Sequence, residues 1–255
     1  MLNAMEESLS IFGVPLTAKR SRDEVRMSLV AMLDGDETRM IVTPNPEMLL
    51  IAHQHAPYAE TLRQADLALP DGIGVQVAAM LRRGRRLHRY AGIDVGEMLL
   101  GLAQERRAPV LFLGGRNGNA ISAAERLTKR HSNLRIYAAA DNVEVSEAGE
   151  IPDPKEESRV RDGILQTKPA IIFVGLGAPK QEEWIRRHIH DFPSVRIMIG
   201  IGGAFDVWSG RLARAPKFLR MIGLEWLWRL FLEPWRFPRA LRAVLVFPFV
   251  ALFRG

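Results

Sequence analysis

The chain of 255 residues contains no cysteine, which excludes disulfide bonds, thiolate nucleophiles and cysteine-based metal sites. It also has no long apolar run: the longest uncharged stretch near the C-terminus, residues 243–253, is 11 residues long and contains a proline. A helix that spans a membrane needs about 20 apolar residues, so we expect none here. The first ten residues, MLNAMEESLS, have no apolar stretch after a basic start, so we expect no secretory signal and a cytoplasmic protein.

Common nucleotide and metal motifs are incomplete or out of place. Neither G-x-G-x-x-G nor G-x-x-x-x-G-K-[ST] is completed. The only D-x-D, Asp34-Gly35-Asp36, follows a predicted helix and precedes a predicted strand. A metal-dependent sugar transferase would place such a pair after a strand, so we interpret it as a solvated loop. The histidine pairs 53/55 and 188/190 fall on different faces of a helix, and we expect no metal site.

The pattern of apolar segments predicts an α/β fold. Residues 110–113 and 170–174 are continuous apolar runs, residues 195–201 are apolar except for Arg196 and Gly200, and each segment is followed by glycines. Such runs are typical of parallel strands that are buried on both faces. We therefore expect a Rossmann-like, open, mostly parallel sheet covered by helices on both faces. Further strands are predicted at 40–43, 65–69 and 134–137, and helices at 21–33, 48–53, 73–81, 92–106, up to 130 and up to 190.

The stretch LALPDGIG, residues 67–74, places Asp71 directly after an apolar strand. Ligands of open α/β folds bind at the carboxyl ends of strands, which makes Asp71 a candidate catalytic group. The alternative is that Pro70-Asp71-Gly72 is only a turn and Asp71 only a helix cap. Thr43 and Asn45 pose the same choice, because they can bind sugar or phosphate oxygens or simply begin a helix.

Basic residues are concentrated in the C-terminal segment. Residues 211–255 hold nine basic and two acidic residues, a net charge of +7, and three of the five tryptophans. A basic, aromatic and apolar segment of this kind is typical of an interfacial membrane anchor. We therefore predict two domains, an α/β domain at 1–210 and a membrane-binding appendage at 211–255. A second basic cluster, residues 82–86 with Arg89 beyond it, is interpreted as a solvated surface or as a contact to a membrane or diphosphate.

A series of motifs makes the chain resemble the WecG/TagA/CpsF family of glycosyltransferases from about residue 10 to 240. The motifs are Thr43-x-Asn45-x-Glu47, Pro70-Asp71-Gly72, Gly92-x-Asp94, Phe112-Leu113-Gly114-Gly115, Gly175-Leu176-Gly177-x-Pro179-Lys180-Gln181-Glu182, Gly202-Gly203-x-Phe205-Asp206 and Gly223-Leu224-Glu225-Trp226. The resemblance implies a metal-independent, inverting enzyme that moves an N-acetylmannosamine-type sugar from a UDP-sugar to a sugar on undecaprenyl diphosphate. It also implies a peripheral protein on the cytoplasmic face of the bacterial plasma membrane, with a role in cell-surface polysaccharide synthesis.

The resemblance also implies roles for individual residues. Asp71 would be the general base, and arginines of the appendage would reach the active site. A chemical reason supports the second point, because arginine binds phosphate oxygens through two parallel hydrogen bonds and can replace a metal ion. The implied catalytic residues are Asp71, Arg229, Arg236 and Arg239, and the implied substrate-binding residues are Thr43, Asn45, Gly72, Gly175, Gly177, Lys180, Gln181 and Asp206.

One segment departs from the family pattern. Residues 140–143, Ala-Asp-Asn-Val, contain no aromatic side chain where family members tend to have a Gly-Tyr-Phe-like segment. Two other functions stay open at this point: a membrane-associated nucleotide-binding protein without transfer activity, and a nucleic-acid binder. The aromatic residues of the appendage lie among aliphatic residues, which favours binding to lipid over binding to nucleic acid. The identity of the sugar, the acceptor glycan and the formation of a homo-oligomer are not determined by these motifs.

Overall fold

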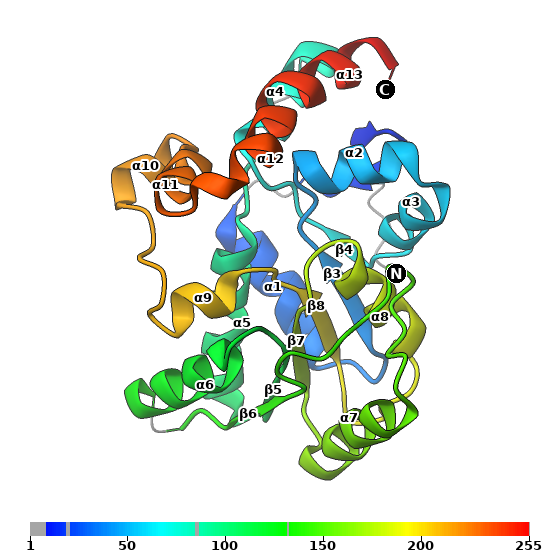
Figure 1. Cartoon of the computed structure of the whole chain (residues 1–255), viewed down its shortest axis with the longest axis vertical. Helices are drawn as coiled ribbons and strands as arrows, with labels where there is room; N and C mark the ends of the chain where they lie inside the picture. The colour runs from blue at the N-terminus through cyan, green and yellow to red at the C-terminus, as the bar shows by residue number, and fades with distance from the viewer. Residues whose placement is uncertain (1–8, 19–20, 85–86, 132, 255) are drawn as a thin grey trace. The chain divides into compact units, whose positions relative to one another are not determined.

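A computed structural model describes residues 9–18, 21–84, 87–131 and 133–254 of the chain (Figure 1). Most of the first ten residues, on which the prediction of no secretory signal depends, lie outside these residues. So does part of the 82–86 cluster, which the sequence analysis interprets as a solvated surface or as a contact. The chain divides into two compact units. The first unit comprises Met1–Glu24, Thr43–Ala91 and Arg214–Gly255, and the second comprises Val25–Val42 and Gly92–Ala213. The predicted boundary at residue 211 remains a prediction, but the second unit ends close to it.

The central element is a six-stranded sheet with the order β4-β3-β8-β7-β5-β6. Pairing from β3 through β8, β7 and β5 to β6 is parallel throughout, as the sequence predicts. Helices flank the sheet, so the expected α/β fold is confirmed (Figure 1). The strands are β3 (Arg39–Val42), β4 (Leu67–Ala68), β5 (Val110–Gly114), β6 (Ile136–Ala139), β7 (Ile171–Gly175) and β8 (Ile197–Gly200).

The core of the second unit explains why its central strands are continuously apolar. Every residue of β5 and β8 is buried, although successive side chains point to opposite faces of the sheet, so both faces are covered. On one face the ring of Phe112 lies 4.8 Å from that of Phe205 and 5.5 Å from that of Trp208. The helices of this unit are α1 (Arg22–Leu33) from Val25 onward, α5 (Gly92–Arg106), α6 (Asn119–Arg130), α7 (Pro154–Thr167), α8 (Lys180–His188) and α9 (Ala204–Trp208).

The first unit contains a two-stranded antiparallel sheet, strand β4 and most of the short helices. Strands β1 (Leu9–Ile11) and β2 (Val14–Leu16) pair through a tight turn. Helices α2, α3 and α4 follow β3 and β4 in the chain. Their bounds are α2 (Pro46–Gln54), α3 (Ala56–Arg63) and α4 (Ile73–Arg83).

The C-terminal segment is helical and packs into the first unit. Phe247 and Ala251 are fully buried, and the ring of Phe247 lies 6.0 Å from that of Phe12 in an edge-to-face arrangement. Phe249 and Phe253, by contrast, are mostly exposed. Within the described ranges, no helix is long and apolar enough to cross a membrane. The elements are α10 (Lys217–Met221), α11 (Glu225–Leu232), η1 (Pro234–Arg236), α12 (Phe237–Leu241), η2 (Arg242–Val246) and α13 (Phe247–Arg254).

Replacement of two glycines of the second unit by alanine should change the free energy of unfolding in opposite directions. A Cβ at Gly175, the last residue of β7, would lie 2.5 Å from the ring of buried Phe205. Gly175→Ala should therefore destabilise the fold by about 1–3 kcal/mol through overpacking. Gly163 lies inside α7, and apart from the backbone of α7 itself no atom lies within 4 Å of an added Cβ. Gly163→Ala should stabilise the fold by about 1 kcal/mol through helix propensity. Urea unfolding followed by circular dichroism measures both changes, and a neutral Gly175→Ala would contradict the close contact.

Candidate active site

Asp71 lies in a loop of the first unit that is held by backbone hydrogen bonds on both sides. Its N–H donates to the carbonyl of Pro44 over 2.9 Å, and the N–H of Tyr90 donates to the carbonyl of Pro70 over 2.9 Å. Gly72 has a φ of +87°, a conformation that favours glycine, and an added Cβ would lie 3.1 Å from the ring of Pro46. The loop after β4 therefore lies against the loop that carries Thr43 and Asn45.

The carboxylate of Asp71 faces an arginine. Arg89 Nη1 lies 3.7 Å from Asp71 Oδ1 and 3.8 Å from Glu225 Oε2, and Arg89 Nη2 donates to the carbonyl of Arg220 over 2.6 Å. Arg214 Nε lies 3.7 Å from the other oxygen of Glu225. A chain of alternating charges thus runs from the Asp71 loop to residues 214–225. The side chain of Arg89 is only 16% exposed, so its interactions are much less screened by solvent than those of a surface pair.

Sequence reasoning missed Arg89, which it grouped with the basic cluster at 82–86. A signal was present in its neighbours, because Leu87, Tyr90 and Ala91 are apolar or aromatic residues, and the structure buries all three. An arginine next to residues that the fold buries is expected to have an anionic partner, because burial of an unpaired charge is costly. The partner could not be named from the sequence, since Asp71 and Glu225 are brought to Arg89 only by the fold.

Thr43 directly follows β3 and Asn45 directly precedes α2, and part of their role is structural. Thr43 is 7% exposed. The side-chain oxygen of Asn45 accepts hydrogen bonds from the backbone N–H groups of Glu47 and Met48 at 3.0 and 3.1 Å, which caps α2. The helix-entry interpretation of Asn45 is therefore confirmed. A role in substrate binding remains a prediction for both residues.

The three predicted catalytic arginines of the segment 211–255, Arg229, Arg236 and Arg239, are paired with two different carboxylates. Glu233 is 5% exposed, and its Oε2 accepts from Arg229 Nε at 3.2 Å and from Arg236 Nη1 at 3.1 Å. One buried carboxylate therefore fixes two guanidinium groups side by side. Arg239 is mostly exposed, and its Nε lies 3.1 Å from Glu47 Oε1 in the first turn of α2, close in sequence to Asn45. Arg239 is thus the tail arginine that contacts the helix behind the 43–45 loop.

In the second unit, Gln181 joins two glycine loops. Its side-chain oxygen accepts from the backbone N–H groups of Gly177 and Gly202, each at 3.1 Å, and its amide donates to Glu182 Oε1 over 2.6 Å. Gln181 and Glu182 are both almost fully buried. Gln181 therefore fixes the shape of the loops that follow β7 and β8. Lys180 is 37% exposed, and its Nζ lies 3.7 Å from Glu147.

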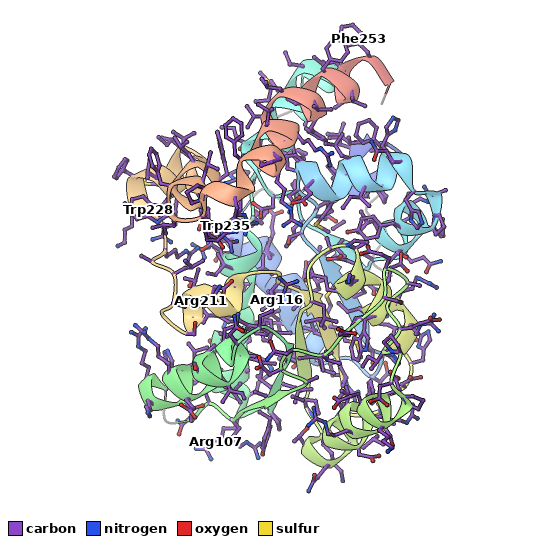
Figure 2. All side chains as sticks on the ribbon, viewed as in Figure 1. Arg107, Arg116, Arg211, Trp228, Trp235 and Phe253 are labelled. Atoms are coloured by element: carbon purple, nitrogen blue, oxygen red, sulfur yellow. The ribbon has the colours of Figure 1, made fainter. Side chains whose placement is uncertain are left out.

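Asp206 belongs to a second polar cluster of this unit. Its Oδ1 accepts from Asn119 Nδ2 at 2.9 Å and lies 3.2 Å from Arg211 Nε. Figure 2 labels Arg211 at the end of α9 and Arg116 in the loop that precedes α6. The side-chain oxygen of Asn119 in turn accepts from the backbone N–H of Arg116 at 2.9 Å. Asp206 is therefore linked through Asn119 to the loop after β5.

The segment that departs from the family pattern contacts this same loop. Asp141 Oδ2 accepts from the backbone N–H of Gly118 at 2.8 Å, and Asn142 Oδ1 accepts from the backbone N–H of Asn117 at 3.0 Å. Gly118 is the N-cap residue of α6. The start of this helix, where an anionic ligand would otherwise be favoured, therefore already holds a carboxylate of the chain itself.

The D-x-D segment is a loop, as predicted. Asp34 accepts two hydrogen bonds from Arg106, from Nε at 2.9 Å and from Nη2 at 3.0 Å. These bonds hold the pKa of Asp34 below its ordinary value.

Two of the paired histidines have partners of their own. His188 Nδ1 lies 2.8 Å from Asp191 Oδ2, and His55 caps α3. Within the part of the chain that the structure describes, no group of three or more histidine, aspartate or glutamate side chains is arranged to hold a metal ion.

The fold and these residues define an α/β protein whose glycine loops follow the central parallel strands, the place where such proteins bind their ligands. Residues 9–254 match the profile of the Glycosyl transferase WecG/TagA/CpsF family. The chain therefore belongs to this family and is a glycosyltransferase, which confirms the resemblance seen in the motifs.

Curated relatives from several bacteria carry one name, N-acetylglucosaminyldiphosphoundecaprenol N-acetyl-beta-D-mannosaminyltransferase. The protein of Bacillus subtilis (strain 168) is 34% identical over 202 residues, which cover 79% of this chain and 75% of the relative. The protein of Bacillus spizizenii is 36% identical over 209 residues, 82% and 77% of the two chains. The protein of Staphylococcus aureus (strain MRSA252) is 32% identical over 207 residues, 81% and 77% of the two chains.

Proposed function

We propose that this glycosyltransferase moves an N-acetylmannosamine-type sugar from a UDP-sugar to a sugar carried on undecaprenyl diphosphate, in the synthesis of a cell-surface polymer. The relatives' shared name supports the acceptor and the sugar class. The observation that carries the mechanism is Asp71, fixed at the end of a parallel strand and facing Arg89 at 3.7 Å. The reaction is a direct displacement with inversion at the anomeric carbon.

Asp71 acts as the general base. Its carboxylate takes the proton of the attacking acceptor hydroxyl while the acceptor oxygen forms its bond to the anomeric carbon and UDP leaves. Arg89 balances the charge of the carboxylate and orients it. The backbone N–H of Asp71 is hydrogen-bonded to the carbonyl of Pro44, so the Asp71 carboxylate keeps a fixed position relative to Thr43 and Asn45. We assign Thr43 and Asn45 to binding of the sugar.

We assign roles to the residues of each unit separately. In the second unit, Gly175, Gly177, Lys180, Gln181 and Asp206 form or support the nucleotide-sugar site. In the first unit, Arg229, Arg236 and Arg239 stabilise the negative charge of diphosphate, with Gly72 permitting the Asp71 turn. Cationic donors fixed in place before the reaction stabilise a leaving diphosphate most effectively. Glu233 provides that fixing for Arg229 and Arg236.

The protein acts as a peripheral protein on the cytoplasmic face of the plasma membrane, through the segment 211–255. Exposed aromatic side chains support this proposal, with Phe231, Trp235 and Phe253 each more than 70% exposed. Figure 2 shows Trp235 in the turn after α11 and Phe253 near the end of α13. Rings of this kind settle at the headgroup level of a bilayer, and the arginines of the segment attract anionic lipid.

A transfer assay tests the proposal. The full chain is incubated with a panel of UDP-sugars and a short-chain polyprenyl-diphosphate-linked N-acetylglucosamine, and both UDP and the disaccharide product are measured. We expect UDP-N-acetylmannosamine to be consumed and the new bond to have the opposite anomeric configuration to the donor. Binding of UDP without consumption of any UDP-sugar would instead indicate a nucleotide-binding protein without transfer activity.

A chelator tests the proposal that no metal cofactor takes part. Arg106 donates to both carboxylate oxygens of Asp34, which leaves the D-x-D loop poorly suited to a cation that bridges to a diphosphate. Excess EDTA should therefore leave the initial transfer rate unchanged. Recovery of a lost rate on addition of Mg²⁺ or Mn²⁺ would contradict the proposal and return Asp34 and Asp36 to consideration as ligands.

A further inference from the structure

Helix α4 has apolar side chains on two opposite faces. On one face Val75, Ala78 and Ala79 are buried. On the other face four large apolar side chains are 36–59% exposed, and they recur at the i, i+4, i+7 and i+8 spacing of a single helix face. We call them the α4 patch: Ile73, Val77, Met80 and Leu81. Because an apolar stripe of this kind normally faces a core, its exposure marks an interaction surface.

The α4 patch adjoins further exposed apolar side chains of the first unit. An added Cβ at Gly223 would lie 3.1 Å from Ile73 Cδ1, so the chain just after α10 contacts the start of α4. Phe218, Met221 and Ile222, which lie on α10 and directly after it, are each more than half exposed. The exposed apolar side chains are therefore gathered in one region, whereas single exposed apolar residues are normally scattered.

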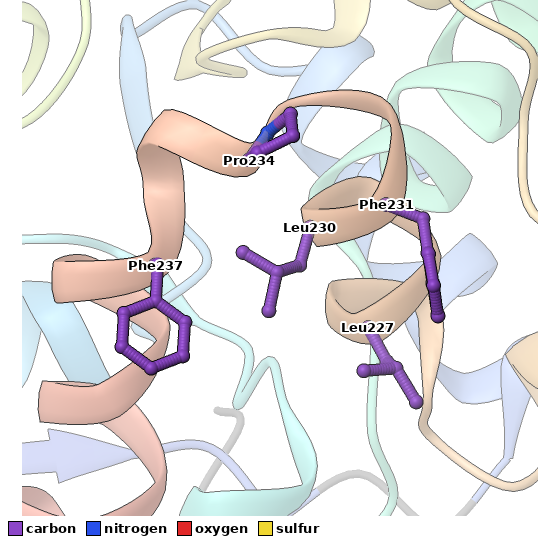
Figure 3. Close-up of a pocket in the computed structure, with 5 residues that line it drawn as sticks. All are labelled: Leu227, Leu230, Phe231, Pro234 and Phe237. Carbon is purple, nitrogen blue, oxygen red and sulfur yellow. The ribbon is translucent and has the colours of Figure 1, made fainter.

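The α4 patch is separate from an apolar hollow in the segment 211–255. That hollow has a volume of about 410 Å³, and Figure 3 shows Leu230 and Phe237 beside it. Its lining residues are Leu227, Leu230, Phe231, Pro234 and Phe237. The hollow thus belongs to the segment already proposed to meet the membrane. The α4 patch shares no residue with the hollow and lies outside that segment.

Charge distinguishes between the bodies that could cover the α4 patch. Residues 72–90 contain five arginines and no acidic residue, and four of these arginines directly follow the patch within residues 82–86. A second copy of the chain, docked about a two-fold axis, would place both sets of arginines in one interface without carboxylates from this stretch to neutralise them. An anionic bilayer supplies the missing negative charge, because basic residues beside an apolar face are attracted to lipid phosphates.

We propose that α4 lies on the anionic membrane surface, with the α4 patch inserted between the lipid headgroups. The inference rests on the proposed function for membrane binding as such, and it adds a contact outside the segment 211–255. With 11 residues, α4 is too short to span a bilayer but can lie in its interface. Its N-cap residue, Gly72, directly follows Asp71. Docking of α4 therefore holds the loop of the proposed general base next to the bilayer, where a lipid-linked acceptor presents its sugar.

Vesicle sedimentation measures the contribution of the α4 patch. Leu81→Gln should weaken binding of the full chain to vesicles of phosphatidylglycerol and phosphatidylcholine by roughly tenfold, through loss of apolar area that the bilayer covers. Leu165→Gln is the matched control, because Leu165 is 42% exposed on α7 of the second unit, and it should leave vesicle binding unchanged. Since Leu81 is 59% exposed, its replacement is not expected to unfold the protein. Equal vesicle binding by the wild type and Leu81→Gln would contradict the inference.

Fluorescent labels at single cysteines show which residues enter the bilayer. The chain contains no cysteine, so Leu81→Cys carries a label at one place only. On the same vesicles, the emission of a nitrobenzoxadiazole label at residue 81 should shift to the blue and be quenched by lipids that carry a nitroxide on the acyl chain. A label on Leu165→Cys should show neither change.

A label at residue 253 separates this inference from the proposed function. If Phe253→Cys responds to vesicles and Leu81→Cys does not, the inference is overturned and membrane binding through the segment 211–255 stands. If neither responds, the proposed membrane binding fails as a whole and the inference fails with it. A blue shift at residue 81 that appears without vesicles, as the protein concentration rises, would assign the patch to a second copy and also overturn the inference. If residue 81 enters the bilayer but the wild-type chain transfers no sugar, the proposed transfer fails and the membrane contact of α4 stands.

Discussion

Replacing Asp71 with asparagine should reduce kcat for sugar transfer by roughly 10²–10⁴-fold, the range expected when a general base is removed. Asparagine preserves the size of the side chain and leaves the backbone N–H of residue 71 able to donate to Pro44. The loss should therefore fall on the chemical step, with little change in KM for either substrate. Initial rates of UDP release at saturating acceptor measure it.

Two measurements make the Asp71 result specific. Asp36→Asn removes a carboxylate from an exposed loop of the second unit and should leave the rate unchanged. Thermal unfolding should give similar midpoints for wild type and Asp71→Asn, since Arg89 keeps Glu225 and the Arg220 carbonyl as partners. A loss of only a few-fold in kcat would return Asp71 to the role of a turn residue.

Replacing Arg236 with alanine should reduce kcat by roughly 10²–10³-fold, the cost of removing one donor that stabilises transition-state charge. Arg229→Ala should have an effect of similar size, because Glu233 fixes both guanidinium groups in the same way. Arg236→Lys should recover only part of the loss, since an ammonium group cannot bind phosphate oxygens with a planar fork. Single-turnover rates with the lipid-linked acceptor measure the step directly.

The control for this second result is Arg242→Ala, which removes the same charge from an exposed position two elements further along. It should weaken binding to anionic vesicles as much as Arg236→Ala does, and it should leave kcat unchanged. Equal loss of kcat in the two variants would mean that the tail arginines act only through membrane attraction. Unfolding midpoints are needed here as well, because Glu233 is buried and loses one partner in Arg229→Ala and in Arg236→Ala.

Much of the sheet could be predicted because its strands are unusually easy to recognise. The strands β5, β7 and β8 are continuous apolar runs that end at glycines, and all of them lie within two residues of the predicted positions. Helix α7 was missed because its exposed surface makes it strongly polar, although Asp153 caps it and Pro154 begins it. The β1–β2 hairpin was missed because strands of three residues are too short for a periodic pattern.

The candidate site could be predicted in its local parts and not in its long-range contacts. The position of Asp71 and the cap formed by Asn45 follow from neighbouring residues, which the sequence displays directly. Arg89 meets Glu225, and Arg239 meets Glu47, across more than a hundred residues of chain. No spacing rule encodes such pairs. The joining of two loops by Gln181 is of the same kind, because it depends on β7 and β8 being neighbours in the sheet.

The burial of Phe247 and Ala251 limits how this enzyme can be recombined with its relatives. An exchange of the C-terminal segment alone would pair a foreign α13 with the native α4 and α2, whose surfaces have adapted to a different partner. Residues 43–91 and 214–255 belong to one compact unit and would have to be exchanged together. Chimeras that respect this grouping should fold and carry the acceptor preference of the donor of those residues. Chimeras joined only at residue 214 should be poorly soluble.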